Sequence, residues 1–369
     1  MHRYIISLFS LAAMFFGLFA WFNVAVDPSN LFGSDELEQE VSEALLKGES
    51  VANLRNYDER IFQKYYVQGL ESAPEVIIIG SSRSLQLRES SFDGKRVFNS
   101  SVSGASLEDY MAIWQLYLAN QIKPDYLVLG IDPWIFNRKN TQVRWKSLAQ
   151  EFNDIGLRLG LDVKQYADVP VSKSKLQTIF SLAYLKASIR VFFATNKTLK
   201  PTEYFITDIL DHPLGVKLYD GSVVSPLNRR DPDQNLVSAD AARFASAGSA
   251  YSMEGYWRID PVLRKSFEAF LDALGSSDVK VMILLPPYHP LAYDGMIQNG
   301  YAIVGAVEEY LRDAAQRRGM VVTGSYDPRR VGCDITEFTD GMHPKEACVR
   351  RLIEPFEELA ARSEKNSEK

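Results

Sequence analysis

The sequence holds only four histidines and two cysteines among 369 residues. Cys-x-x-Cys pairs, the HExxH metalloprotease motif, the Walker A motif and GxGxxG are all absent from it. We therefore expect no metal or nucleotide cofactor. Long runs of Lys or Arg are absent too, and the net charge is −6. Because a protein that follows nucleic-acid phosphates needs a basic surface, we do not expect nucleic acid as a partner.

Charged residues are missing from Tyr4 to Val26. A helix rises about 1.5 Å per residue, so this segment can cross a hydrocarbon core of roughly 30 Å. A cleaved signal peptide is the alternative, but its apolar region usually has about 7–15 residues and ends at a small-x-small site. Bulky residues such as Trp21 and Phe22 occupy those positions here. We predict an uncleaved transmembrane anchor.

The charges on either side of the anchor predict its orientation. Arg3 precedes it, and five acidic residues follow it: Asp27, Asp35, Glu36, Glu38 and Glu40. Basic residues remain on the cytoplasmic side of a membrane. We therefore expect a single-pass protein of the inner (cytoplasmic) membrane, with its C-terminal domain in the periplasm or another extracytoplasmic space.

The rest of the chain predicts an α/β domain with a parallel sheet. Near-continuous apolar strands alternate with helical patterns, which is typical of a parallel sheet covered on both faces. This regularity weakens at about 140–260, which we interpret as a large insertion. The predicted parts are a cytoplasmic stub at 1–3, the anchor at 4–26, a polar helical stalk at 27–72, the α/β domain at 73–362 and a disordered tail at 363–369.

Serines follow the first predicted strand, EVIIIG, at its carboxyl end. Gly80 ends the strand, and Ser81, Ser82 and Ser84 come directly after it. Ligands and catalytic groups collect at this edge of an open α/β sheet. A serine-rich turn is often only a turn, so a nucleophile needs a partner base from elsewhere in the chain.

Histidine is the base that best activates a serine hydroxyl at neutral pH. His2 lies on the cytoplasmic side of the anchor, His212 lies in the insertion, and His289 has no acid within three residues. His343 follows Asp340 by three residues in the turn FTDGMHP. That spacing lets the carboxylate accept a hydrogen bond from Nδ1 and leaves Nε2 as the base.

These blocks resemble the SGNH (GDSL-type) hydrolase superfamily, which implies a flavodoxin-like three-layer α/β fold. IIIGSSRS resembles the nucleophile block and maps the nucleophile onto Ser82. FNSSVSGAS resembles the second block, so Gly104 would join the Ser82 amide in the oxyanion hole. DGMH resembles the last block and maps the acid and base onto Asp340 and His343. The resemblance covers roughly residues 75–135 and 280–360.

The third block departs from the family pattern. Where the family has an oxyanion-stabilising Asn, LGIDPWIFN has Asp132, which cannot donate a hydrogen bond when ionised. Either Asp132 is structural, another donor such as Asn137 or a backbone amide replaces it, or hydrolysis is weak. Arg83, Trp134 and His289 are possible pocket residues, each with packing as the alternative.

The GSS turn, the Asp-Pro-Trp block and the anchor together are similar to membrane-tethered cell-envelope members, including proteins of alginate O-acetylation and teichoic-acid D-alanylation. That resemblance implies a serine acyltransferase or esterase that acts on an acylated donor and a polysaccharide acceptor. An integral-membrane acyltransferase would be its partner. The alternative is a catalytically silent scaffold that recruits such a partner.

Cys333 and Cys348 flank the Asp-x-x-His turn. In an oxidising compartment they could form a disulfide, which would hold the turn to the last helix. Two separate thiols are the alternative.

Overall fold

The structure is a computed structural model. It describes residues 2–27, 35–140, 142–166, 179–194, 204–230, 232–246 and 250–367.

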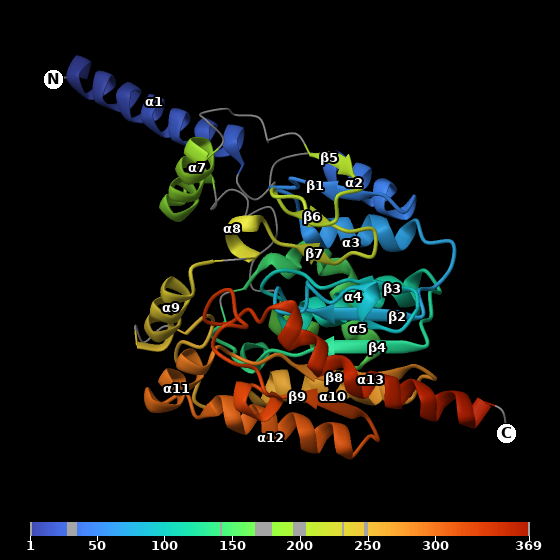
Figure 1. Cartoon of the computed structure of the whole chain (residues 1–369). Helices are drawn as coiled ribbons and strands as arrows, with labels where there is room; N and C mark the ends of the chain where they lie inside the picture. Colours follow the sequence, from blue (N-terminus) through green and yellow to red (C-terminus); the bar gives the residue numbers. More distant parts are fainter. Residues whose placement is uncertain are drawn as a thin grey trace.

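Five parallel strands form the central sheet (Figure 1). They are β2 (Val76–Gly80), β3 (Val97–Asn99), β4 (Tyr126–Gly130), β8 (Lys280–Leu285) and β9 (Val321–Gly324). Their order across the sheet is β3-β2-β4-β8-β9, so the order reverses between β2 and β4. In such a sheet, a crevice opens at the carboxyl ends of the strands where the order reverses. Ser82 and Asp132 follow the two strands at this position.

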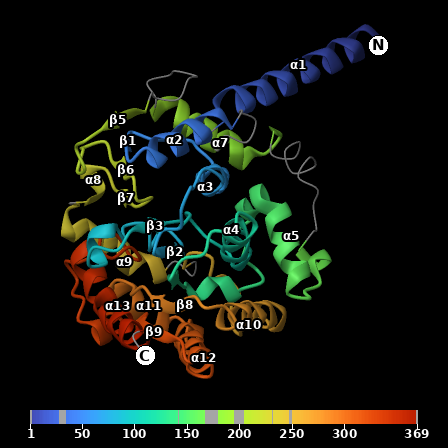
Figure 2. The ribbon, with the colours of Figure 1, turned by 90° about the vertical axis from the view of Figure 1, so that its right-hand side faces the viewer.

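Apolar side chains point to both faces of this sheet, because successive residues of a strand alternate. Ile77 and Ile79 pack into a large core with three helices: α4 (Leu107–Ala119), α10 (Pro261–Gly275) and α12 (Ile303–Gln316). Val76 and Ile78 pack on the other face against α13 (Glu346–Ser367). Figure 2 shows α4 and α10 on one side of the strands and α13 on the other. The expected α/β domain with a parallel sheet is confirmed.

The predicted stalk is not a stalk. Its helices form, as α2 (Glu36–Leu46) and α3 (Glu59–Gln68), but they pack on the domain. Val41, Leu45 and Phe62 share a buried cluster with Phe98 of β3. Because the apolar residues of both helices are buried in this cluster, the described part of 27–72 belongs to the globular domain.

The predicted insertion contains a second sheet that its composition did not reveal. Short antiparallel strands of the insertion flank β1 (Ser50–Ala52) in the order β5-β1-β6-β7. The three insertion strands are β5 (Phe205–Thr207), β6 (Val216–Lys217) and β7 (Val223–Val224). The described part of this region also has α5 (Ala149–Arg158), α7 (Leu182–Ala194), α8 (Leu227–Arg230) and α9 (Gln234–Ser246). The presumed stalk and the insertion therefore build one subdomain together.

Both ends of the chain are helical. The apolar segment forms α1 (His2–Val26), which projects from the domain (Figure 1). Its window Phe9–Val26 is long and apolar enough to cross a membrane. At the other end we expected disorder from residue 363, but α13 continues to Ser367. The residues from 363 to 367 include neither Gly nor Pro, the strongest helix breakers.

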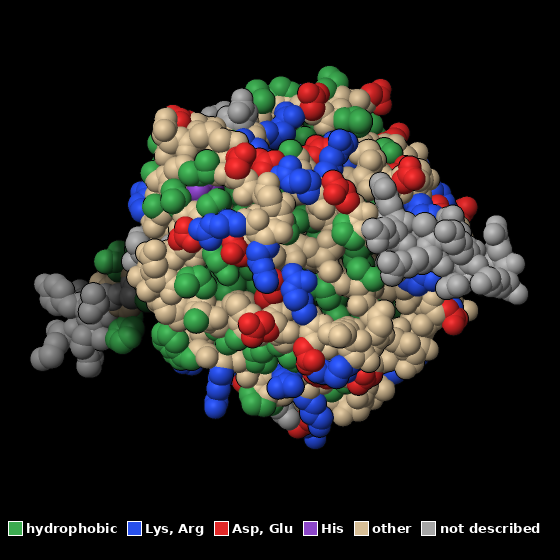
Figure 3. All heavy atoms as spheres, turned by 60° about the horizontal axis from the view of Figure 1, so that its bottom comes forward, with side chains coloured by type: hydrophobic (Ala, Val, Ile, Leu, Met, Phe, Trp, Pro, Cys, Tyr) green, Lys and Arg blue, Asp and Glu red, His purple; other side chains and the backbone are tan. Residues whose placement is uncertain are grey.

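Charge is mixed on the face of the molecule that Figure 3 displays. Lys and Arg side chains alternate there with Asp and Glu side chains.

Candidate active site

The nucleophile turn is shaped by two glycines on neighbouring strands. Gly80 and Gly130 face each other in register at the ends of β2 and β4. The side chain of Ser84 lies directly over both: a Cβ on Gly80 would lie 2.6 Å from Ser84 Oγ, too close for any side chain. Only glycine at these positions lets the chain leave β2 and fold back at once.

The three serines of this turn have three different surroundings. Ser84 is fully buried over the glycines. Ser81 is also buried, and its Oγ accepts a hydrogen bond from the Arg83 N–H at 3.2 Å. Ser82 alone is partly exposed, and its Oγ lies 2.9 Å from His343 Nε2. The geometry therefore singles out Ser82 as the candidate nucleophile.

The Asp340–His343 turn is tightly closed. Asp340 Oδ1 accepts from the backbone N–H groups of Met342 and His343 at 2.8 and 2.9 Å. Its other oxygen lies 2.7 Å from His343 Nδ1. Burial raises the pKa of Asp340, but the hydrogen bond with His343 and the two backbone donors outweigh it and lower the pKa overall. The carboxylate therefore stays ionised beside the ring.

These contacts form a chain of hydrogen bonds from Asp340 through His343 to Ser82. An ionised carboxylate can only accept, so it fixes the imidazole proton on Nδ1. The lone pair of Nε2 then faces the Ser82 hydroxyl. Residues 261 positions apart in sequence meet at one point. This arrangement can remove a proton from the serine.

Arg83 is the buried residue that joins the two halves of this chain. Its Nε donates to the Met342 carbonyl oxygen at 2.8 Å, beside His343. Nη1 donates to Asp132 Oδ1 at 2.7 Å, and the guanidinium lies 4.1 Å from the centre of the Tyr288 ring. Arg83 thus ties the serine turn to the histidine turn. It does not line an open pocket, because it is about 1% exposed.

Asp132 acts as the counter-ion of Arg83. Both side chains are fully buried. Burial raises the pKa of Asp132, and the adjacent Arg83 opposes that rise. In either protonation state, the oxygen facing Arg83 accepts from the guanidinium. Asp132 stands where the SGNH pattern has Asn, and it pairs here with a buried arginine. The side-chain amide of Asn137, the other donor considered for this role, donates instead to the carbonyl oxygen of Ser252.

Gly104 lies in the loop between β3 and α4 with a left-handed φ of 59°, a conformation that favours glycine. Within the described part of the chain, no acceptor meets the backbone N–H of Gly104 or that of Ser82. Nearly all buried backbone donors in proteins are paired. An oxyanion hole needs backbone donors that are free of other acceptors, and these two N–H groups meet that condition in the loops that follow β2 and β3.

Trp134 bonds to the loop between β3 and α4, at the residue after Gly104. Its Nε1 donates to the Ala105 carbonyl oxygen at 3.0 Å, and the side chain is completely buried. His289 is buried too, at the start of α11 (Pro290–Gln298), where Nδ1 accepts from the Leu291 N–H. Its backbone N–H donates to the Gly341 carbonyl oxygen within the Asp340–His343 turn. Burial lowers the pKa of His289. Both residues support the site from behind.

Three residues of the insertion lie against the loop that carries Gly104, the candidate oxyanion loop, and sequence reasoning did not identify them. A Cβ on Gly104 would lie 2.4 Å from Arg144 Nη2, 2.6 Å from Tyr251 OH and 3.1 Å from Gln142 Oε1. Gln142 also donates to Tyr251 OH at 2.6 Å. No motif marks these residues. Only the return of the insertion over the sheet brings them to Gly104.

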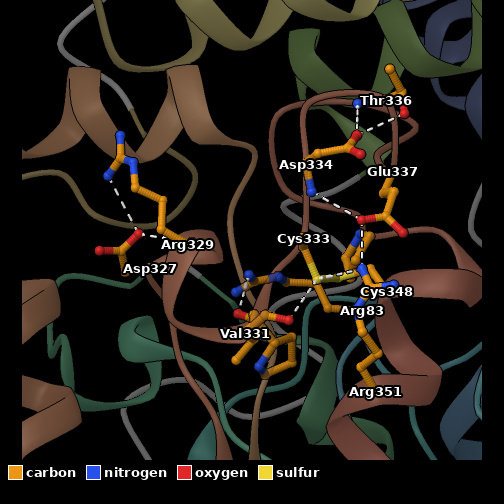
Figure 4. Close-up of a disulfide and its surroundings, with 12 residues drawn as sticks. Arg83, Asp327, Arg329, Val331, Cys333, Asp334, Thr336, Glu337, Cys348 and Arg351 are labelled. Carbon is orange, nitrogen blue, oxygen red and sulfur yellow. Dashed lines mark hydrogen bonds and ion pairs between the residues drawn. A yellow bond between two sulfur atoms is a disulfide. The ribbon is translucent and has the colours of Figure 1, made fainter.

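Cys333 and Cys348 are joined as a disulfide, with their Cα atoms 5.4 Å apart. The bridge connects the loop before the Asp340–His343 turn to α13. Arg351 reaches both Cys333 Sγ and Glu337 next to it (Figure 4). The two cysteines are 15 residues apart in sequence. Closing a loop of this length stabilises a fold by about 3 kcal/mol in the chain-entropy model. Of the two alternatives, the structure has the bridge.

A groove of about 1190 Å³ lies outside the triad. It runs between the loop after β1, the β6–β7 hairpin and α8, and its lining includes Arg55, Lys217 and Arg229. Neither Ser82 nor His343 lines it. Among the described residues, no group of three or more His, Cys, Asp or Glu is arranged to hold a metal ion.

No curated protein and no solved structure matches the chain. One family model does match, over residues 46–357, and so covers both sheets and the whole triad. The chain therefore belongs to the family described as protein of unknown function DUF1574.

Proposed function

We propose that this protein is a membrane-anchored, extracytoplasmic serine acyltransferase or esterase of the SGNH type. Its substrates would be an acylated donor and a cell-envelope polysaccharide or exopolysaccharide. One observation carries the proposal: Ser82 Oγ lies 2.9 Å from His343 Nε2, while Nδ1 of the same ring lies 2.7 Å from Asp340.

The strand order supports the SGNH-type assignment. Counted along the chain, the parallel strands lie in the order 2-1-3-4-5, which is the order of flavodoxin-like sheets. Ser82 follows the first of these strands, where the order reverses, and the Asp-x-x-His turn follows the last. Both agree with the blocks that the sequence shares with the superfamily.

In the first step, Ser82 Oγ would attack the carbonyl carbon of an ester or thioester as His343 Nε2 takes the hydroxyl proton. Asp340 stabilises the imidazolium that forms. The carbonyl oxygen becomes an oxyanion, held by the N–H groups of Ser82 and Gly104. Collapse breaks the bond to the leaving alcohol or thiol, which receives the proton from His343 and leaves an acyl-serine.

In the second step, a sugar hydroxyl attacks the acyl-serine and loses its proton to His343. Its oxygen forms the new ester bond, and Ser82 Oγ leaves with the proton restored. Water in place of the sugar gives hydrolysis. Arg144 Nη2 is the atom nearest to the position that a Cβ on Gly104 would occupy, and we assign to Arg144 the donor role that Asp132 cannot fill.

The location rests on the anchor and the disulfide. α1 has the length and hydropathy of a membrane span, and a structural disulfide is typical of an oxidising compartment. A catalytic domain tethered there would meet envelope polymers and an acyl donor delivered through the membrane. An integral-membrane acyltransferase is the partner that fits this supply.

A catalytically silent scaffold remains the second candidate, and one observation favours it. Asp132 replaces a side-chain donor, and its carboxylate is bound to Arg83. Loss of one oxyanion donor costs about 2.7–4 kcal/mol in other enzymes. If Arg144 does not replace that donor, the protein could keep the fold and only recruit the acyltransferase.

A fluorophosphonate probe tests the chemistry, because an activated serine oxygen displaces fluoride from phosphorus. We expect the full-length protein in detergent to be labelled at Ser82, as mass spectrometry of the modified peptide would verify. Ser82→Ala should abolish labelling. His343→Ala should slow it by about 10²–10⁴-fold, the usual contribution of a general base.

Ser90→Ala is the matched control, since Ser90 is an exposed serine of the same region. It should be labelled like the unchanged protein. Labelling that persists in Ser82→Ala, or a small acetyl ester that is not hydrolysed by the folded protein, would favour the scaffold.

A further inference from the structure

Helix α7 of the insertion packs against the C-terminal half of the apolar anchor α1. Phe192 of α7 meets Phe22 of α1 edge to face, with ring centroids 5.6 Å apart. Phe180, just before α7, meets Phe16 in the same way at 6.4 Å. Figure 1 shows α7 beside the end of α1 that enters the domain. Residues about 160 positions apart thus form a two-helix unit.

Hydrogen bonds between polar side chains fix this unit. Asn23 is fully buried between the helices; its Nδ2 donates to the Ile179 carbonyl oxygen at 2.8 Å, and its Oδ1 accepts from Ser188 Oγ at 3.0 Å. Tyr184 OH donates to Asp27 at 2.5 Å. Polar groups within a membrane need partners of this kind, because lipid offers none.

A second face of α7 is apolar and uncovered. Leu182, Ile189 and Phe193 are seven and four residues apart, so they form one stripe along the helix. Leu182 is 69% exposed and Phe193 63%. Lys186 is exposed on the same face, four residues after Leu182 and three before Ile189, so one charged residue interrupts this stripe. Its long side chain can keep the ammonium group at a polar boundary while its methylenes lie on apolar surface.

The position of α7 along the anchor suggests what covers this stripe. Phe16 precedes Val26 by ten residues, which is about 15 Å along a helix. Phe180, in contact with Phe16, therefore reaches well into the depth that a spanning α1 would occupy. The apolar side chains of α1 are uncovered as well, since Phe9, Phe15 and Trp21 are all exposed.

We propose that α7 is a second membrane-binding element, whose Leu182–Ile189–Phe193 stripe inserts into the outer leaflet beside the anchor. The occupant of the stripe is lipid. Two attachment points would fix the height and tilt of the catalytic domain above the membrane, where a single helix would leave it free to swing. The inference rests on the membrane anchoring in the proposed function and is independent of the chemistry of Ser82.

Depth-dependent fluorescence quenching tests it in the full-length chain. Both native cysteines are in the disulfide, so an introduced cysteine is the single free thiol to carry a fluorophore. We choose Leu182→Cys and Phe193→Cys, reconstituted in vesicles of phosphatidylethanolamine and phosphatidylglycerol. Nitroxide-labelled lipid should quench both fluorophores several-fold more than aqueous iodide does.

Two controls separate the possible failures. Leu236 of α9 is 68% exposed, nearly the same as Leu182, but lies away from α1. A fluorophore on Leu236→Cys should therefore be quenched by iodide only. Phe9→Cys lies within the anchor and should respond to lipid only. If Phe9→Cys is quenched by iodide, the anchoring itself is wrong.

If Phe9→Cys responds to lipid while Leu182→Cys and Phe193→Cys behave like Leu236→Cys, the inference about α7 is overturned alone. Quenching of the α7 positions by neither agent also overturns it, because a second copy of the chain then covers the stripe.

Discussion

The two sides of the candidate site are each held by a buried Arg–Asp pair, but the pairs are built into different parts of the molecule. On the nucleophile side, Arg83 pairs with Asp132. On the oxyanion side, Arg60 pairs with Asp109, and these side chains are 2% and 1% exposed. Neither pair touches solvent, so their difference lies in what else each arginine holds.

Arg83 lies next to the candidate triad. It directly follows the candidate nucleophile Ser82, and it donates to the Met342 carbonyl oxygen beside His343. Every element it joins belongs to the central sheet or to the loops at its carboxyl edge. Movement of Arg83 would therefore change the distance between Ser82 and His343 itself.

Arg60 holds the candidate oxyanion loop rather than the turns that carry Ser82 and His343. It comes from α3, in the segment expected to be a stalk, and makes two bonds to Asp109 and one to the Ser103 carbonyl oxygen. Asp109 in turn accepts from the Ser106 N–H and so closes the start of α4. The candidate oxyanion loop is thus positioned by α3 and α4, which lie outside the sheet. The candidate nucleophile Ser82 is positioned by the strands of the sheet and the loops at their carboxyl ends.

The strongest test of this difference is Arg83→Met. It leaves Asp132 buried without its partner, and removal of one member of a buried pair costs about 3–5 kcal/mol. We also expect fluorophosphonate labelling of the remaining folded protein to fall by at least about 100-fold, because the histidine turn loses its tie to the serine turn. Thermal unfolding and labelling rates of the full-length protein measure the two effects.

The double variant Arg83→Met/Asp132→Leu separates the two effects. Replacing both members of a buried pair with apolar residues is often neutral for stability. We expect stability to recover in the double variant while labelling stays slow. Recovery of labelling together with stability would mean that Arg83 only stabilises the fold.

Arg60→Met sharpens the comparison from the other side. The loss of stability should be similar, about 3–5 kcal/mol, because Asp109 is left equally buried. Labelling of the folded fraction should fall by less than about tenfold. The Gly104 loop keeps its bonds from Trp134 to Ala105 and from Ser103 to Glu59. A loss of labelling as deep as in Arg83→Met would contradict the division between the two sides.

This division also explains how much the sequence could predict. Strands β2, β4 and β8 are short, near-continuous apolar runs, and a parallel sheet covered on both faces requires such runs. β2 and β4 end in glycine, and proline follows β8. Ser82, Asp340 and His343 follow from motifs that need only a strand end and a three-residue turn. Local pattern predicted the strands and the Asp340–His343 turn, but the choice of Ser82 among the three serines came from the resemblance to the SGNH blocks.

The oxyanion side could not be predicted in the same way. β6 and β7 have two residues each, too few to display an alternating pattern. α3 was recognised as a helix, but its polar exterior suggested a stalk, because nothing local indicates that Arg60 meets Asp109. Arg144 has no motif and reaches Gly104 only through the path of the insertion. Long-range contacts decide all three.

Arg144→Gln should have the smallest effect on stability and is the test most specific to the oxyanion side. Arg144 is exposed and bonds Gln142 at 3.4 Å, so stability should change by less than about 0.5 kcal/mol. If its guanidinium replaces the missing Asn donor, hydrolysis of a small acetyl ester should slow by about tenfold. That is less than the loss of a preorganised, buried donor, because water screens an exposed one. Arg138→Gln is the matched control, an exposed arginine of the same segment whose partner is Asp260. Equal rates in the two variants would assign the oxyanion to the amides of Ser82 and Gly104 alone.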